Sequence, residues 1–569
     1  MNMTENSQSE VTPGVWPAGV APIKKEFLVK KDTEVAEVAN GSEQRLDDGN
    51  DGEEKVEKQK PDRRNRKERR GIDKNREKKM AKARAEIRSK LVRLCPSVLL
   101  PGRTCKYGDK CTCEHSIEKY LGQKEPDLGD KCVIFDRAGK CQYSFACRFG
   151  NAHLKDGQQL EKEPAADYEP LRNTESLPIQ IAMRKKQFDF SRADEIVKNL
   201  PGQTGAMERE KLRLNMRDLA GKPYLAPLTT VGNLPFRRLC VKFGAGITCS
   251  EMAVATSLLQ GNPSEWSLVK RHPSEKIFGV QLAGGFPDTM ARSAQILVDK
   301  FDVDFIDINL GCPLDVVNEK GGGCTLSTRP QKLLKVVSAM NQVMKDVPLT
   351  LKFRYGMKEG LRETHHVMKK VVETCPPQLI TIHPRSKEQR YTRPAEWDYI
   401  PTCAEAIGGK IPLWGCGDVF SPQDYYNRLE NYPIDGLMIG RSALIKPWCF
   451  KEFEEKSLWD ISATERLDYY REFVNYGLEH WGSDDAGVET TRRFFLEWLS
   501  FTHRYIPVGL LEVLPPKINN RPPAYRGRNE LETLLASDKG SDWVKITEMF
   551  LGKVPEGFLF VPKHKANAY

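Results

Sequence analysis

Short apolar runs alternate with longer amphipathic stretches between Pro223 and about Trp448. Eight of these runs have the length and composition of buried β-strands. In chain order they are YLAPLT, GITCSEM, IFGVQLAG, VDFIDINLGC, LTLKFR, LITIHPR, IPLWGCGDV and GLMIGRSA. Their carboxyl ends follow one another at intervals of 24 to 43 residues, and a strand with its crossover helix needs about 30 residues. The spacing therefore predicts an α/β fold of eight βα units, closed into a TIM (β/α)8 barrel over residues 217–459. An open doubly wound sheet is the alternative, but it would be unusually long.

The hydrophobic pattern differs on both sides of the predicted barrel. Residues 460–569 carry apolar side chains at i, i+3 and i+4 spacing without intervening strands, which predicts a C-terminal helical domain. Residues 156–216 combine a proline-containing linker with a helical stretch. Residues 1–62 are rich in Glu, Asp, Ser and Gly and have almost no apolar periodicity, so we expect a disordered acidic tail there.

The positive charge of the chain is concentrated in one short segment. The 569 residues contain 88 Lys and Arg against 78 Asp and Glu, a formal net charge of +10. Residues 63–93 hold fifteen basic and four acidic side chains, a net charge of +11, so the other 538 residues sum to −1. This basic arm is typical of a nucleic-acid contact, a nuclear import signal or both, and its composition does not separate these functions.

The sequence predicts neither a membrane span nor secretion. Its apolar runs fall short of the roughly 18 residues of a transmembrane helix. The start, MNMTENSQSE, lacks the basic and apolar regions of a signal peptide. The fifteen cysteines are therefore expected to be thiols or metal ligands rather than disulfides. We expect a monomer in the cytoplasm, the nucleus or both.

Seven of the fifteen cysteines lie within residues 94–155, in two similar groups. Each group offers three thiolates and one imidazole, a complete donor set for tetrahedral zinc. The predicted metal ligands are Cys95, Cys105, Cys111 and His115 in the first group, and Cys132, Cys141, Cys147 and His153 in the second. Cys113 leaves an ambiguity, because it could replace a ligand of the first group. A module this small has little core, so bound zinc would supply much of its folding free energy.

The two groups resemble CCCH zinc fingers, a family that usually binds RNA. Aromatic and basic residues interleave around the cysteines: Tyr107, Phe135, Tyr143, Phe145 and Phe149 with Lys106, Lys110, Arg137, Lys140 and Arg148. Exposed rings could stack on unpaired bases while the cations meet phosphates. The alternative is that the rings form a minimal core around the metal.

Polar side chains stand at the carboxyl ends of the predicted strands, where TIM barrels carry their chemistry. Strands three to six end in Gln281, then Asn309 and Cys312, then Lys352 and Arg354, then His383 and Arg385. The last two strands end in Cys416-Gly417-Asp418 and Gly440-Arg441. Glycine backbone N–H groups after strands seven and eight form the usual barrel phosphate site, and a neighbouring arginine can hold a phosphate. With no G-x-G-x-x-G after a strand, flavin mononucleotide (FMN) in the barrel mouth fits better than a Rossmann-bound dinucleotide.

These motifs together resemble the tRNA-dihydrouridine synthase family. The resemblance rests on APLTTVGNLPFRRLC, VQLAG, DINLGCPLDVV, LKFR, TIHPRS, GCGDV and IGRSAL, and covers roughly residues 90–569. Two CCCH fingers, a barrel, a helical domain and the ending KHKANAY are similar to the eukaryotic branch of the family that reduces uridine 47 of tRNA.

The resemblance implies an enzyme in which NADPH, or NADH, reduces FMN, and the reduced flavin passes a hydride to C6 of a flipped-out uracil. Cys312 is then the general acid, because an ordinary thiol is mostly protonated near neutral pH. By analogy Lys352 and His383 contact the flavin or the uracil carbonyls, Gln281 contacts the flavin ring, and Asn309 and Arg354 bind the substrate. The further predicted FMN contacts are Pro227, Leu228, Thr229, Cys416, Gly417, Asp418, Gly440 and Arg441. Gly321–Gly323 is either the hinge of a mobile lid or a plain flexible loop.

One residue departs from the family pattern. The family usually has Asn-Gly-Asp after strand seven, whereas this chain has Cys416-Gly417-Asp418, so a side-chain hydrogen bond to the cofactor would be lost. Two other functions stay open: a small-molecule flavin oxidoreductase similar to dihydroorotate dehydrogenase, and an RNA-binding protein with an inactive barrel. The fingers and the basic arm count against the first, and the intact Cys312, Lys352 and His383 count against the second. Whether messenger RNA is also a substrate stays open as well.

Overall fold

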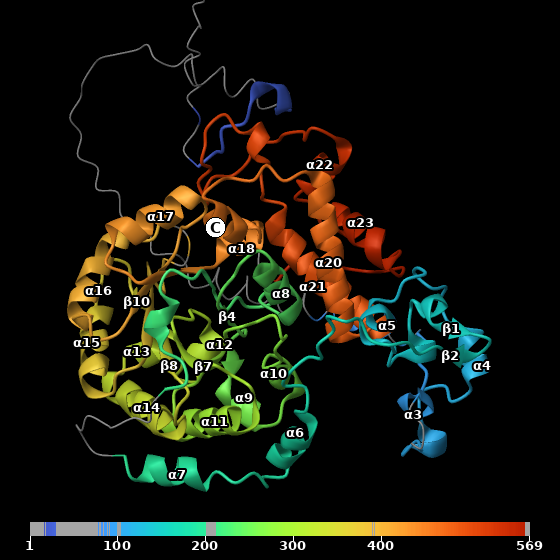
Figure 1. Cartoon of the computed structure of the whole chain (residues 1–569), viewed down its shortest axis with the longest axis horizontal. Coiled ribbons are helices and arrows are strands. Elements are labelled where there is room, and N and C mark those ends of the chain that lie inside the picture. Colours follow the sequence, from blue (N-terminus) through green and yellow to red (C-terminus); the bar gives the residue numbers. More distant parts are fainter. Residues whose placement is uncertain are drawn as a thin grey trace, which may run out of the picture.

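The computed structural model describes residues 16, 19–29, 104–200, 212–389, 391 and 393–563, together with most of 78–99. Its centre is a barrel of parallel strands surrounded by a ring of helices (Figure 1). The strands are β3 (Tyr224–Leu225), β4 (Thr248–Cys249), β5 (Ala253–Val254), β6 (Phe278–Ala283), β7 (Phe305–Leu310), β8 (Leu349–Gly356), β9 (Leu379–Ser386), β10 (Leu413–Cys416) and β11 (Gly436–Ile439). Their order is β3-β11-β10-β9-β8-β7-β6-β4, with β5 also on β6. The bridge between Tyr224 and Ile247 brings β3 beside β4 and closes the cylinder.

The predicted TIM barrel is therefore confirmed, and each of the eight apolar runs contains a strand. Nearly every residue of the long strands β6, β7, β8 and β9 is buried, as expected for a parallel sheet whose two faces are both covered. The barrel helices are α8 (Leu234–Lys242), α9 (Ala255–Leu259), α10 (Pro263–Ser267), α11 (Pro287–Lys300), α12 (Asp315–Asn318), α13 (Cys324–Ser327), α14 (Pro330–Val343), α15 (Thr364–Thr374), α16 (Ile400–Ile407), α17 (Pro422–Asn431), α18 (Arg441–Ile445) and α19 (Cys449–Glu455).

The predicted helical domain follows the barrel and packs on one side of it (Figure 1). It contains α20 (Ala463–Trp481), α21 (Asp485–Thr502), α22 (Glu530–Leu535) and α23 (Gly540–Leu551). A capping box at Ser462 and Glu465 starts α20, which satisfies backbone N–H groups of its first turn. The α21 side chain Trp498 donates its indole N–H to the carbonyl of Leu444 in α18, at 3.1 Å. This buried contact anchors the helical domain to the end of the barrel.

Residues 19–29 lie against the helical domain rather than in solvent. Backbone hydrogen bonds join Ala21 to the carbonyl of Arg521 (2.7 Å) and Lys24 to that of Leu510 (2.9 Å). The side chains of Ala21 and Ile23 are fully buried against the loop that follows α21. The prediction of a disordered tail over residues 1–62 is thus wrong for 19–29, because these few apolar side chains find a partner almost 500 residues away. Apart from Trp16, the rest of that range lies outside the described residues.

The cysteine-rich module and the linker lie outside the barrel (Figure 1). The module contains α3 (Pro96–Leu99), α4 (Ile117–Leu121), α5 (Val133–Ala138) and a small hairpin of β1 (Leu154–Lys155) and β2 (Gln158–Gln159). The linker forms α6 (Leu177–Arg184) and α7 (Ser191–Lys198), which run under the barrel, and the backbone N–H of Ala193 bonds to Gln295 of α11 at 3.0 Å. The basic arm, residues 63–93, lies largely outside the described residues. Within the described part of the chain, we find no helix with the length and apolar character of a membrane span.

Candidate active site and metal centres

The polar residues predicted from the strand ends meet at one end of the barrel, which we call the barrel mouth. Neighbouring strands place them side by side, because Asn309 of β7 is in register with Lys352 of β8. Likewise, Arg354 of β8 is in register with His383 of β9. Pro227, Leu228 and Thr229 follow β3 directly, and the Leu228 side chain lies near Gly440 at the end of β11.

Cys312 lies in the loop after β7, and both its backbone N–H and its carbonyl are hydrogen-bonded. Its backbone N–H donates to the Asn309 side-chain oxygen at 2.8 Å, and its carbonyl accepts from Asn318 of α12 at 2.9 Å. Gly323 packs directly on it, since a Cβ there would stand 2.9 Å from the Cys312 carbonyl oxygen. Burial raises the pKa of the Cys312 thiol, so the thiol carries its proton at neutral pH and suits proton donation.

His383 of β9 is buried among cations, two strands from β7 in the barrel. Burial first, and then the positive charges of Arg354 and Arg385, hold the pKa of His383 well below its usual range, so the ring is neutral. The Arg385 guanidinium lies 3.0 Å from His383 Nε2. Because a guanidinium can only donate, Nε2 accepts, and the ring proton stays on Nδ1.

The Asp418 carboxylate binds two arginines at the barrel mouth. Its carboxylate accepts two 2.7 Å bonds from Arg385 and a further bond from Arg441, and the backbone N–H of Ala395 adds another at 2.7 Å. Burial acts to raise the pKa of Asp418, but the two guanidiniums outweigh it and hold this pKa below its usual range. Asp418 therefore positions the two arginines, and its predicted contact with FMN stays a prediction.

Four further residues contact the predicted site residues, although the sequence pattern assigns them no role. Arg385 stands at the rim and bonds to Asp418. Tyr391 lies beneath the guanidinium of Arg441, whose carbon is 4.5 Å from the ring centroid. Asn519 reaches the mouth from the helical domain and accepts from Arg441 at 3.2 Å. Asp307 lies below the mouth and bonds to Gln281 at 2.8 Å. Only the alternation of apolar and polar residues before Asn309 could have indicated Asp307, since residues two apart on a strand share a face.

The donor set of the mouth fits FMN. Four cationic side chains, Lys352, Arg354, Arg385 and Arg441, outnumber the three carboxyl groups of Glu251, Asp307 and Asp418 at this end of the barrel, which leaves positive charge for a phosphate. A Cβ built on Gly440 would meet Leu228 at 3.8 Å and Ala226 at 3.9 Å, so no side chain crowds the backbone where the phosphate is expected. Cys416 is buried in an apolar cluster with Trp414 and Met438, and its predicted contact with FMN stays a prediction.

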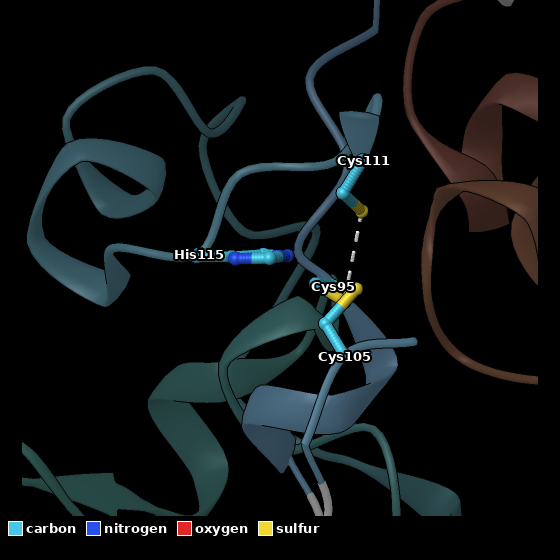
Figure 2. A group of neighbouring side chains, drawn as sticks. All are labelled: Cys95, Cys105, Cys111 and His115. Carbon is cyan, nitrogen blue, oxygen red and sulfur yellow. Dashed lines mark hydrogen bonds between the residues drawn. The ribbon is translucent and has the colours of Figure 1, made fainter. Parts of the chain in front are cut away.

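Both predicted zinc groups come together in space. In each, the four ligand atoms all lie within 4.8 Å of one another, and the Cys95 and Cys111 sulfurs are 3.9 Å apart. Tetrahedral zinc with bonds of about 2.3 Å needs about 3.8 Å between sulfurs. Figure 2 shows Cys95, Cys105, Cys111 and His115 converging on one point. Cys113 lies outside this group, which answers the ambiguity left by the sequence.

The two groups differ in their surroundings. In the first, His115 is exposed and two of the cysteines are half-buried, whereas the second group is entirely buried. Neither ring nitrogen of the buried His153 has a hydrogen-bond partner, as expected of an imidazole that binds a metal. The loop between α20 and α21 closes over the second group: the Ser483 hydroxyl lies 3.1 Å from the Cys147 sulfur, and Arg148 pairs with Asp485 at 2.6 Å. The second finger is therefore docked on the helical domain.

The sequence left open whether the aromatic rings of the fingers stack on bases or form a core around the metal, and the structure shows both exposed and buried rings. Phe135 and Phe149 are buried beside the second group, and Phe135 lies 5.5 Å from the His153 ring. Tyr107, in the first finger, is 74% exposed. The first finger thus keeps a ring free for a ligand, whereas the second uses its rings as core.

A barrel whose mouth carries a protonated thiol and a cationic cofactor site defines an oxidoreductase of the flavin-dependent barrel type. The family model described as Dihydrouridine synthase (Dus) matches residues 224–485, and that of the DUS3L CCCH zinc finger domain matches residues 90–123. The chain belongs to the dihydrouridine synthase family, as its motifs predicted, and the alternative of a dihydroorotate dehydrogenase-like enzyme is excluded.

Three relatives that cover most of the chain are named as tRNA-dihydrouridine(47) synthases or proteins like them. The protein from Rattus norvegicus named tRNA-dihydrouridine(47) synthase, NAD(P)(+)-like, is 47% identical over 533 residues, which covers 84% of this chain and 82% of the relative. The Homo sapiens protein of the same name is 47% identical over 532 residues, covering 84% and 81%. The Coprinopsis cinerea protein named tRNA-dihydrouridine(47) synthase is 38% identical over 676 residues, covering 97% of this chain and 98% of the relative.

Proposed function

We propose that this protein is an FMN- and NAD(P)H-dependent tRNA-dihydrouridine synthase that acts on uridine 47. The observation that carries the proposal is the buried, protonated thiol of Cys312, held at the mouth of a barrel of this family beside a cationic cofactor site. The names of the relatives support the position in the tRNA.

The residues of the barrel mouth have different roles in the reduction of the uracil C5–C6 double bond. FMN, reduced by NAD(P)H, supplies the hydride that reaches C6. The Cys312 thiol gives its proton to C5, so that one hydride and one proton are added, and solvent then returns a proton to the sulfur. Lys352 and Arg354 stabilise negative charge on the uracil carbonyl oxygens as it grows. His383, being neutral, offers its Nδ1–H as a donor without adding charge.

The two fingers and the basic arm bring the RNA to the barrel. Each finger holds one structural Zn²⁺ through its Cys3His set. The exposed Tyr107 and its neighbours Lys106 and Lys110 are suited to stack on a base and contact phosphates. The basic arm, residues 63–93, adds sequence-independent and salt-sensitive affinity, and also supports a place in the nucleus as well as the cytoplasm. We expect a monomer.

The function is tested with the purified full-length protein. We expect a yellow protein that is bleached by NADPH and recovers its colour when tRNA lacking dihydrouridine is added. Cys312→Ala is expected to keep FMN and the bleaching but to lose the recovery with tRNA. A colourless protein, or one that NADPH does not bleach, would instead favour an RNA-binding protein with an inactive barrel.

A further inference from the structure

Asp307 is a buried carboxyl group below the barrel mouth to which the proposed mechanism gives no task. It lies on β7, is 2% exposed, and has Gln281 of β6 and Thr350 of β8 as its register partners. A charge in such a place is costly unless hydrogen bonds compensate it. Both of its oxygens do have partners: Thr350 Oγ1 donates to Oδ1 at 2.6 Å, and Gln281 Nε2 donates to Oδ2 at 2.8 Å.

These bonds continue in one direction as far as the catalytic loop. Because Gln281 donates to Asp307 through Nε2, its Oε1 is turned to accept from Asn309 Nδ2, at 2.8 Å. Asn309 Oδ1 is then turned to accept the backbone N–H groups of Gly311 (3.2 Å) and Cys312 (2.8 Å). Each side-chain amide thus has its orientation fixed by the neighbour below it.

We propose that Asp307 is a positioning residue, which orients the Gln281 and Asn309 amides and thereby holds the backbone of Cys312 where its thiol can reach the substrate. This inference rests on the proposed role of Cys312 as the proton donor. Asp307 itself touches neither that thiol nor the space above it. It acts through two intervening amides, and the acceptor oxygen at its Oδ2 position is the feature that the chain of bonds requires.

The hydrogen bond from Gln281 requires an acceptor oxygen at Asp307, whether or not the carboxyl group is ionised. Burial raises the pKa of Asp307 to about 6, and the groups that face it are Lys352 on β8, Cys249 on β4 and Tyr224 on β3. When the carboxyl group is protonated, its O–H can turn to Thr350, whose hydroxyl also accepts. The other oxygen still accepts from Gln281. An asparagine at this position can still accept from Gln281 through its oxygen and can donate its N–H to the Thr350 hydroxyl, whereas a leucine can do neither.

The test compares Asp307→Leu with Asp307→Asn in the full-length protein. A displacement of about 1 Å at a reacting group can cost about a hundredfold in rate. We therefore expect Asp307→Leu to slow reoxidation of the flavin by tRNA by about that factor, while NADPH still bleaches the flavin at a rate much closer to that of the unchanged protein. Asp307→Asn should restore most of the tRNA-dependent rate. Asp304→Asn is a matched control, because Asp304 directly precedes β7 and its carboxylate accepts from Arg271 and from the backbone N–H of Phe278 instead.

Hydrogen exchange gives a readout that needs neither turnover nor bound flavin. The backbone N–H groups of Gly311 and Cys312 should exchange faster in Asp307→Leu, but not in Asp307→Asn or Asp304→Asn. Equal protection and equal tRNA-dependent rates in Asp307→Leu would overturn the inference, and so would an Asp307→Asn variant as slow as the leucine one. If Asp307→Leu does not fold, Thr350→Val replaces it, with the same but smaller changes expected. Full tRNA reduction by Cys312→Ala would refute the proposed function instead and leave the exchange result standing.

Discussion

Asp418→Asn tests whether the two arginines at the mouth depend on one carboxylate. Asp418 is 12% exposed as a side chain, and it binds Arg385, which is fully buried, and Arg441, which is 8% exposed. The replacement keeps the size of the side chain but removes its charge. It also turns an amide N–H₂ towards groups that can only donate, namely the guanidiniums and the N–H of Ala395.

The expected loss of stability is large because one partner of a buried ion pair disappears. Removing one member of such a pair costs about 3–5 kcal/mol, which is a large share of the roughly 5–15 kcal/mol that stabilises a typical domain. Asp398→Asn is the matched control: Asp398 also pairs with an arginine, Arg362, at 2.7 Å, but its side chain is 68% exposed. Exposed pairs of this kind contribute about 0–1 kcal/mol. Urea unfolding followed by tryptophan fluorescence measures both free energies of unfolding.

The pKa of Asp418 also predicts in which direction the free energy of unfolding changes with pH. The folded protein holds the pKa of Asp418 below its usual range, so the carboxylate stabilises the fold above the unfolded pKa, about 3.9, and this contribution fades as the pH falls through the folded value. The gap between the unchanged protein and Asp418→Asn should therefore be full at pH 7 and narrow below about pH 4. Equal stability of Asp418→Asn and Asp398→Asn at pH 7 would refute the idea that Asp418 holds the arginines.

Three further predictions concern the parts around the barrel. A chelator should remove the zinc of the first finger before that of the second, because only the second group is buried under Ser483; simultaneous release, followed with a coloured zinc indicator, would contradict this. Ile23→Asp should speed hydrogen exchange in residues 19–29 and 509–526, whereas the exposed Glu26→Lys should not; unchanged exchange in Ile23→Asp would show that the segment does not depend on this side chain. Deleting residues 63–93 should weaken tRNA binding most at low salt and leave flavin bleaching unchanged; binding measured at two salt concentrations decides between RNA contact and an import signal alone.

The barrel could be predicted because its signal is local. Each strand is a short apolar run, the runs recur at the length of a βα unit, and parallel strands buried on both faces leave a nearly continuous apolar pattern. Residues 19–29 could not be predicted in the same way. Ile23 belongs to a weakly apolar stretch that becomes structured only against Leu510 and Leu511, so its burial depends on a contact that local patterns do not contain.

The candidate site shows the same difference between residues with a local sequence signal and residues placed by long-range contacts. The sequence pattern places Cys312, Lys352 and His383 at strand ends, where the fold itself assigns chemistry. In the structure Cys312 follows β7, whereas Lys352 and His383 lie within β8 and β9, which are neighbours in the sheet. Their partners follow from packing between distant segments. Asn519 meets Arg441 across 78 residues of chain, and sequence spacing indicates no such pairing.

The central claim is that Cys312 delivers the proton with which this barrel forms dihydrouridine in tRNA. The most direct measurement maps dihydrouridine, nucleotide by nucleotide, in tRNA that lacks it after incubation with NADPH and the FMN-loaded protein or its Cys312→Ala variant. We predict dihydrouridine at position 47 with the unchanged protein, and an unmodified uridine there with Cys312→Ala, although NADPH bleaches both flavins alike. Dihydrouridine formed equally well by Cys312→Ala, or none at position 47 with the unchanged protein, would contradict the account.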